Sequence, residues 1–368
     1  MNLFVVMKLS DSSLRNMISP IADLDMIQSI RVIRDTKGPD IKKVLYSTPG
    51  SWIQFFPSLV AIPGKLIYIV WYSIIEKPAL IHSFLFFPHG LIALIAGKLT
   101  RRKTGLSLIA GPVELHSVGG SPLGTYSYCR PLPAPNLKSR VIVSLLKQFD
   151  VITVPGSFSR EYLLARGLDA SKVFTVHHVI DDQFRPMNLV KDLDVVYVGR
   201  LAPVKHIETF IQAIKMVSER FPAVRAAIVG TGECRPYLEK LTSEYGLNDN
   251  IQFAGYQESV IEWYNRSRLS ILASEREGFP YTIIESLKCG VPVVTSNCGD
   301  VTDIVRDGFN GRIVNNYRDH QGFAEAILDL LQNPVRLSEF SENSLLSIKD
   351  LTPDKIGEQW MNVFRAIN

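Results

Sequence analysis

Two glutamates, Glu277 and Glu285, stand eight positions apart in a segment that suits an extended ligand. Pro280 between them favours the first turn of a helix, which would reach Cys289 and stop at Gly290. Glu277 would then lie on the loop before the helix and Glu285 about one turn inside it, roughly 12 Å away if the spacing were fully helical. Backbone N–H groups at a helix N-terminus suit an anion between the two carboxylates. A sugar joined to a nucleoside through a diphosphate has this layout.

Two cations earlier in the chain suit such a diphosphate. Arg200 and Lys205 follow a predicted strand that ends at Val198, and Gly199 allows a tight turn at the end of that strand. Near the start of the next helix, each charge could meet a phosphate oxygen. The alternative is that both are solvated surface cations. Their place in the same half of the chain as Glu277 disfavours this alternative.

Three more glycines mark turns after predicted strands. Gly230 and Gly232 form a Gly-Thr-Gly turn, which lacks the third glycine and the ribose-binding acid of a dinucleotide fingerprint. An NAD enzyme is therefore disfavoured, and the absence of a Gly-x-x-x-x-Gly-Lys-Ser/Thr motif excludes a P-loop NTPase. The loop at Gly255 could lie against a flat base, although a plain strand-to-helix turn explains it equally well.

The elements that must position these residues alternate between strands and helices along the whole chain. This alternation predicts an α/β protein with two doubly wound, Rossmann-like domains, each a parallel sheet with helices on both faces. Ligands bind such folds at the carboxyl ends of the strands. Strands are predicted at Leu3–Met7, Ile30–Ile33, Lys43–Tyr46, Ala79–His82, Leu106–Ile109, Val151–Val154 and Val173–Val176, and then at Val195–Val198, Ala226–Val229, Ile251–Phe253, Leu269–Ala273, Val293–Thr295 and Arg312–Val314.

The chain length of 368 residues fits two domains. The segment 181–188 has no clear period, so we place the boundary there, with an N-terminal domain over 1–186 and a C-terminal domain over 187–349. The tail, 350–368, contains an amphipathic stretch around Trp360, and we expect it to pack back on the first domain.

Composition excludes several classes of protein. The four cysteines have neither zinc nor disulfide spacing, the start of the chain lacks the shape of a signal peptide, and no basic stripe interleaved with aromatics indicates nucleic-acid binding. Residues 1–110 hold 13 Lys and Arg against 6 Asp and Glu, and they include two long apolar stretches, 58–75 and 84–97. Pro, Gly and Lys interrupt these stretches, which favours buried core helices over a membrane span; an interfacial face, helped by Arg101, Arg102 and Lys103, is the other alternative.

Together, the motifs of the second half resemble the retaining glycosyltransferases of the two-domain GT-B fold, especially the large family 4, also described as glycosyl transferases group 1. The resemblance runs from about Asp194 to Leu331. It rests on the order of five pieces: Val198-Gly-Arg-Leu201 with Lys205, Val229-Gly-Thr-Gly-Glu233, Phe253-Ala-Gly255, the Glu277 and Glu285 pair, and Gly290-Val-Pro-Val-Val294.

The resemblance implies roles for these residues. Arg200 and Lys205 would hold the donor diphosphate and stabilise its developing charge, Glu277 would face the donor sugar, and Glu285 would bind the ribose hydroxyls. The backbone of Gly278 and Phe279, next to Pro280, would lie near the phosphates and the sugar. Such enzymes use a nucleotide-sugar co-substrate and normally need no metal and no further cofactor.

The first half departs from the family pattern. Lys8–Ser13 lacks the glycine-rich loop that often follows the first strand, and Ile109-Ala-Gly-Pro112 stands where a His-Gly pair is common. His116, Glu114 and His89 are the candidate acceptor-side residues, with His82 as a further histidine; each is more often structural or solvent-facing than functional.

We therefore expect a cytoplasmic, retaining glycosyltransferase that transfers a sugar from a UDP- or GDP-sugar to a glycan or lipid-linked saccharide in cell-surface polysaccharide synthesis. The basic, apolar first domain suggests peripheral contact with the inner face of the membrane. The alternatives are another enzyme of the same fold, either a phosphorylase or a sugar-nucleotide epimerase, and a catalytically inactive subunit that binds a nucleotide-sugar.

Overall fold

The computed structural model describes residues 1–7, 10–48, 58–116, 137–180 and 182–367, with side chains described from residue 63 onward in the helix that begins at 58. The chain forms two compact units. The first comprises Met1–Val179 together with Leu351–Asn368, and the second comprises Ile180–Asp350. Each unit has its own parallel β-sheet.

The sheet of the first unit has seven strands in the order β3-β2-β1-β4-β5-β6-β7, and every adjacent pair is parallel. Strand β1 lies inside the sheet, and the direction of winding changes between β1 and β4. The strands are β1 (Asn2–Val6), β2 (Ser29–Ile33), β3 (Val44–Ser47), β4 (Leu80–Ser83), β5 (Lys103–Ser107), β6 (Val151–Val154) and β7 (Val173–Thr175).

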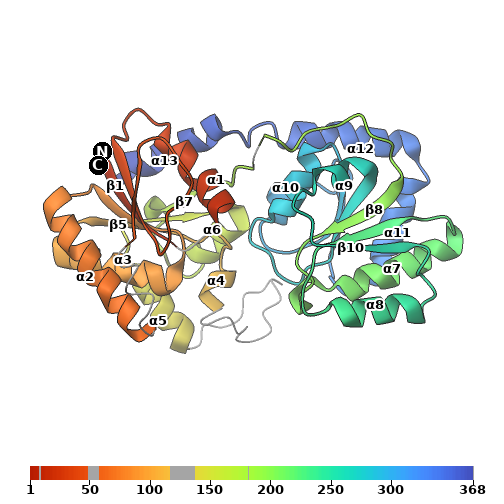
Figure 1. Ribbon diagram of the computed structural model, residues 1–368, viewed down its shortest axis with the longest axis horizontal. Coiled ribbons are helices and arrows are strands. Elements are labelled where there is room, and N and C mark those ends of the chain that lie inside the picture. The colour runs from red at the N-terminus through yellow and green to blue at the C-terminus, as the bar shows by residue number, and fades with distance from the viewer. Residues whose placement is uncertain (8–9, 49–57, 117–136, 181, 368) are drawn as a thin grey trace. The chain divides into compact units, whose positions relative to one another are not determined.

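Helices cover this sheet, as Figure 1 shows. The α2 and α3 helices pack together, and they bury Ile69, Ile92 and Ala96 against Phe4 and Ile81 of the sheet. The last helix of the chain, α13, lies beside α1. The helices of this unit are α1 (Asp11–Ala22), α2 (Ser58–Glu76), α3 (Leu91–Thr100), α4 (Val113–His116), α5 (Leu137–Leu146), α6 (Ser157–Leu164) and α13 (Pro353–Ile367), with a π-helical turn at η2 (Phe86–Gly90) and a 3₁₀ turn at η3 (Ala170–Lys172).

The sheet of the second unit has six strands in the order β10-β9-β8-β11-β12-β13, again all parallel. This is the strand order 3-2-1-4-5-6 of doubly wound nucleotide-binding domains. The strands are β8 (Leu193–Val198), β9 (Ala226–Val229), β10 (Ile251–Gly255), β11 (Ser267–Leu272), β12 (Val293–Ser296) and β13 (Gly311–Val314).

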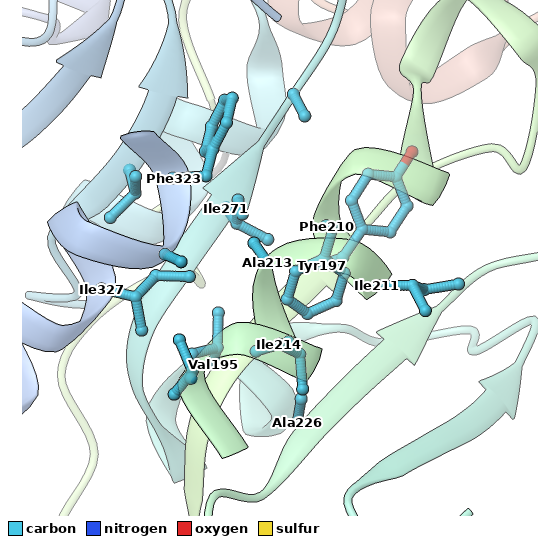
Figure 2. Packing of buried hydrophobic residues seen from close by; sticks show 14 of the residues in the cluster. Val195, Tyr197, Phe210, Ile211, Ala213, Ile214, Ala226, Ile271, Phe323 and Ile327 are labelled. Carbon is cyan, nitrogen blue, oxygen red and sulfur yellow. The ribbon is translucent and has the colours of Figure 1, made fainter. Parts of the chain in front are cut away.

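The core of the second unit forms where α7 packs on β8. Phe210, Ala213 and Ile214 face Val195 and Tyr197, and Figure 2 shows the Tyr197 hydroxyl pointing out of this cluster. The spacing of the α7 residues places them on one helical face, and all of them are buried. The helices are α7 (Ile207–Arg220), α8 (Arg235–Glu244), α9 (Ile261–Arg266), α10 (Tyr281–Lys288), α11 (His320–Leu331) and α12 (Pro334–Ser347), with 3₁₀ turns at η4 (Pro203–Lys205) and η5 (Val301–Asp303).

The prediction of two Rossmann-like α/β domains is confirmed. Each predicted strand overlaps an observed one, although β5 begins at Lys103 rather than at Leu106. The units divide at 179/180, whereas the sequence placed the boundary at 186/187. The intervening segment is tied to the second unit, because Lys288 donates to the Ile180 carbonyl at 2.9 Å and Asn265 donates to the Arg185 carbonyl at 3.1 Å.

Candidate functional site

The predicted donor-site residues meet at one edge of the second sheet. From β8 the chain builds β9 and β10 on one side and then crosses to β11 on the other, so the direction of winding reverses between β8 and β11. In open α/β sheets, ligands bind at the carboxyl ends of the strands at such a reversal. Gly199 and Arg200 follow β8, and the segment 274–280 follows β11.

Glycines let three strand ends approach closely there. The Gly199 N–H donates to the Val229 carbonyl at 3.0 Å, and the Gly230 N–H donates to the Gly255 carbonyl at 2.8 Å. A Cβ atom on Gly230 would lie 1.9 Å from the Gly199 carbonyl oxygen, and the φ of Gly230 is +139°. Only glycine allows this approach.

The second glycine of the Gly-Thr-Gly turn has the same kind of role. A Cβ atom on Gly232 would lie 2.3 Å from the Leu201 carbonyl oxygen, which accepts a hydrogen bond from the Cys234 N–H at 3.0 Å. The glycines therefore fix the path of the loop that carries Arg200. Close backbone packing accounts for Gly230 and Gly232 without any ligand contact.

Lys205 and Glu277, predicted from separate motifs, lie together. Lys205 ends the η4 turn, and its Nζ is 2.5 Å from Glu277 Oε1, with 23% and 11% of the two side chains exposed. The turn and the loop are also joined by their backbones, because the Glu275 N–H donates to the Val204 carbonyl at 3.0 Å. A half-buried cation and carboxylate are thus held side by side at the strand ends.

The charges of Arg200 and Glu277 both affect the pKa of Tyr197, which lies near the end of β8. Burial raises the pKa of Tyr197 well above its usual value, the charge of Glu277 raises it further, and the Arg200 guanidinium opposes this. The Tyr197 hydroxyl donates to the Arg200 carbonyl at 3.1 Å, and Arg200 itself is exposed. Tyr197 therefore stays a neutral donor to the backbone of the loop that carries Arg200.

A loop after β12 supports the segment from Glu277 to Pro280. The Asp300 N–H donates to the Gly278 carbonyl at 3.0 Å, and a Cβ atom on Gly299 would lie 2.0 Å from the Glu277 carbonyl oxygen. Phe279 is buried. This loop was not predicted as part of the site, although it directly follows the predicted strand Val293–Thr295.

Glu285 lies on α10, as predicted, and it is partly buried. The Tyr264 hydroxyl of α9 donates a hydrogen bond to Glu285 Oε2 at 3.1 Å. Burial raises the pKa of Glu285 to about 7, and the Tyr264 hydrogen bond opposes this rise. The helix ends as predicted, because Gly290 follows it with a φ of +70°. The Glu285 carboxyl group therefore titrates closer to neutral pH than an exposed glutamate does.

The candidate acceptor-side residues, Glu114, His89 and His116, differ in their surroundings. The backbone N–H groups of Ala110 and Phe86 donate to the Glu114 carboxylate at 2.8 and 3.3 Å, and burial raises the pKa of Glu114 to about 7. These bonds tie two loops together and account for Glu114 structurally. His89 is buried, and the side chain of His116 lies outside the described residues.

The further histidine, His82, is part of a buried polar chain. Its Nε2 lies 2.7 Å from the Ser107 hydroxyl, which lies 2.6 Å from the Thr153 hydroxyl. Burial lowers the pKa of His82 to about 3, so the ring is neutral at physiological pH. Trp360 of α13 contacts the ring edge to face.

Ser107 and Thr153 also line a pocket of the first unit at the carboxyl ends of β5, β6 and β7. The pocket encloses about 370 Å³, its open mouth included, and α13 contributes Ile356 and Trp360 to its wall. His177 and His178 line it as well, and the Gln359 side chain bonds both the N–H and the ring Nδ1 of His177 at 2.9 Å. Neither histidine had been predicted as a site residue.

Comparison with known proteins points to one family for the second unit. Residues 179–345 match the family model described as "Glycosyl transferases group 1". This match covers most of the second unit and leaves most of the first unit outside it.

Curated relatives match over a similar part of the chain. A D-inositol 3-phosphate glycosyltransferase 2 of Catenulispora acidiphila is 30% identical over 201 residues, which are 49% of this chain and 47% of that protein. A poly(ribitol-phosphate) alpha-N-acetylglucosaminyltransferase of Staphylococcus aureus is 24% identical over 54% of this chain and 40% of its own length. The match thus spans less than half the length of either relative.

Solved structures match over the whole chain. The Anabaena protein HepE, solved in complex with UDP, superposes with a TM-score of 0.77 over 99% of this chain and 100% of its own, at 18% sequence identity. Another structure of HepE holds UDP-glucose. At this identity the likeness establishes a shared fold, with two parallel-sheet Rossmann-like domains.

Proposed function

We propose that this protein is a glycosyltransferase that uses a nucleotide-sugar donor, with UDP as the carrier. The observation that carries the proposal is the pairing of Lys205 with Glu277 at the strand reversal of the second unit, where Arg200 follows β8 and Glu285 lies on the helix α10 that follows β11. The family match of residues 179–345 supports it, and the UDP-bound relative of the same fold supports the choice of base.

In this proposal the charged residues divide the donor between them. Glu285 accepts hydrogen bonds from the ribose hydroxyls in its ionised form, and Glu277 accepts from hydroxyls of the sugar. Arg200 and Lys205 bind the diphosphate, so Lys205 exchanges part of its interaction with Glu277 for a phosphate oxygen. The loop glycines hold these groups in place before the donor arrives.

We further propose that transfer retains the anomeric configuration by a front-face route. The bond from the anomeric carbon to the leaving phosphate oxygen breaks while a bond to the acceptor oxygen forms on the same face. The acceptor proton passes to the leaving phosphate, so the protein supplies no separate base. Arg200 and Lys205 stabilise the negative charge that grows on the leaving diphosphate, and this role requires no metal ion.

The acceptor in this proposal is a glycan or a lipid-linked saccharide of a cell-surface polysaccharide, and the enzyme works in the cytoplasm at the inner face of the membrane. The pocket beside His177 and Trp360 in the first unit is our candidate for the acceptor contacts. The polyol-phosphate acceptors in the names of curated relatives are consistent with a polymer or polyol substrate.

The proposal is tested by turnover of UDP-glucose and other UDP- and GDP-sugars with a panel of saccharide acceptors. We expect UDP release that depends on the acceptor and survives EDTA, with an α-linked product from an α-linked donor by NMR. Arg200→Ala and Lys205→Ala should each reduce turnover about a hundredfold or more, because each removes a charge that stabilises the transition state.

The control is Lys240→Ala, which removes an exposed cation from α8 of the same unit. Its turnover should match that of the wild type. Wild-type turnover in both Arg200→Ala and Lys205→Ala would contradict the proposal. Dependence on free phosphate, or conversion of the donor without acceptor, would replace it with a phosphorylase or an epimerase, and donor binding without any turnover would indicate an inactive subunit.

A further inference from the structure

One face of the first unit presents large apolar side chains to solvent. On α2, Ile67, Trp71, Ile74 and Ile75 are 70%, 64%, 58% and 58% exposed. Their spacing of four, three and one residues places them on one side of the helix, and the opposite side buries Ile69 and Ser73. The α2 helix is thus apolar on both sides, although packing on the first sheet requires only one apolar side.

The neighbouring helix extends this face. The α3 helix packs against α2, and it exposes Ile95 and Leu99 at a spacing of four residues. We call these six side chains, four from α2 and two from α3, the α2–α3 face. Figure 1 shows both helices on the outside of the first sheet. Large exposed apolar side chains on two neighbouring helices are typical of an interaction site.

Exposed basic residues adjoin the α2–α3 face in the sequence. From Pro63 to Lys103 the sequence has six Lys and Arg residues and one acidic residue. Two of the six are paired with aspartates from outside this range: the buried Lys65 with Asp35 at 2.6 Å, and Lys103 with Asp150 at 3.1 Å. The acidic residue, Glu76, is neutralised by Arg31 at 2.5 Å. Lys77 and Lys98 are exposed, and Arg101 is exposed directly after α3. We call Lys77, Lys98 and Arg101 the rim of the face; the rim is positively charged.

We propose that the α2–α3 face binds the surface of an anionic lipid bilayer, with its apolar side chains in the interface and its cations at the headgroups. Apolar residues including Trp on one side, with Lys and Arg at the border, are typical of interfacial helices. Among the described residues no helix is long and apolar enough to cross a bilayer. The inference rests on the proposed function in that a lipid-linked acceptor would bring the enzyme to a bilayer.

The charge of the rim favours a bilayer over a second copy of this chain. A symmetric contact would place the same cations of two copies close together, and like charges across an interface oppose association. An anionic headgroup layer instead attracts each cation, by about fivefold in binding per Lys or Arg near the surface.

Vesicle sedimentation tests the proposal without donor or acceptor, so its outcome is independent of transfer activity. We expect the full chain to bind vesicles of phosphatidylcholine and phosphatidylglycerol in a two-to-one ratio, and to bind pure phosphatidylcholine vesicles much more weakly. Ile67→Gln, Trp71→Gln and Ile74→Gln together should weaken binding about tenfold or more. Lys98→Gln with Arg101→Gln should weaken it by roughly twenty-fivefold at low salt, and added salt should shrink that effect.

A matched control carries three Gln substitutions at exposed apolar residues of the second unit: Val190, Val335 and Leu346. This control should bind vesicles like the wild type. Equal binding by the α2 triple variant and the control would overturn the proposal, and so would equal binding to both kinds of vesicle. A dimer that light scattering detects in the wild type, that the α2 triple variant loses, and that accompanies no vesicle binding would replace the bilayer with a second copy.

Discussion

The close approach of the Gly230 and Gly199 backbones at the candidate donor site predicts that Gly230→Ala disrupts this site. The new Cβ atom would lie 1.9 Å from the Gly199 carbonyl oxygen, and Cβ contacts under 3.0 Å essentially do not occur. The two loops must therefore separate by more than 1 Å, although the φ of +139° already disfavours any side chain at this position.

The cost follows from what that separation disrupts. The Gly230 N–H bond to Gly255 at 2.8 Å and the Gly199 N–H bond to Val229 at 3.0 Å both hold the strand ends together. Losing two backbone hydrogen bonds costs about 1 kcal/mol each, and the backbone strain adds about 1–2 kcal/mol. We expect Gly230→Ala to destabilise the second unit by about 3–4 kcal/mol and to displace Arg200 from its place after β8.

Gly246→Ala is the matched control, because Gly246 also has a positive φ, of +67°, but no other atom lies within 4 Å of the place that a Cβ atom would take there. It should cost only the strain of about 1–2 kcal/mol. Hydrogen exchange of peptides that cover β8 and β9 reports the second unit by itself, and calorimetric titration with UDP-glucose reports the site. Gly230→Ala should lose protection and UDP-glucose binding, while Gly246→Ala should keep the binding. Equal protection and equal binding in the two variants would refute the reasoning.

Three more predictions concern single side chains. The affinity for UDP-glucose should fall about tenfold from pH 8 to pH 6, because the Glu285 pKa of about 7 means that the anion is lost over this range. Titration calorimetry should show that Glu285→Gln removes this pH dependence. An equal pH dependence in the variant would contradict the role of Glu285 in binding the ribose. Glu277→Gln should reduce sugar transfer more than UDP binding, since the residue is assigned to the sugar, and the reverse pattern in kinetics and calorimetry would exclude that assignment. Trp360→Ala should destabilise the first unit by about 3–5 kcal/mol, because the ring is buried against His82 and Phe364; unchanged hydrogen exchange in β4 and β5 would show that α13 does not support this unit.

Much of the fold could be predicted from the sequence because its signals are local. Short apolar runs between helical patterns identified the strands, and Pro280 with Gly290 delimited α10 to within one residue. The helix α12 was not predicted, although Asn333 caps it through a bond from the Arg336 N–H and Pro334 occupies its first turn. Its few buried residues, Phe340 and Ser344, gave too weak a periodic pattern.

Contacts within the candidate site could be predicted where neighbouring strands carry the two residues, and not where they depend on how helices or loops pack together. The proximity of Lys205 to Glu277 follows from two strands being neighbours in the sheet, which the Rossmann-like prediction implied. The Tyr264 bond to Glu285 depends instead on how α9 packs against α10. The same limit explains Glu114, whose partners Ala110 and Phe86 come from two separate loops.

The central claim is that the second unit binds a nucleoside diphosphate through Lys205 and its neighbours, and calorimetric titration of the full chain with UDP tests it most directly. We predict one UDP bound per chain, an affinity reduced about tenfold or more in Lys205→Ala because a charged hydrogen bond to phosphate is lost, and no change in Lys240→Ala. If UDP, GDP and ADP all fail to bind the folded wild-type protein, or if UDP binds Lys205→Ala as tightly as the wild type, the account is contradicted.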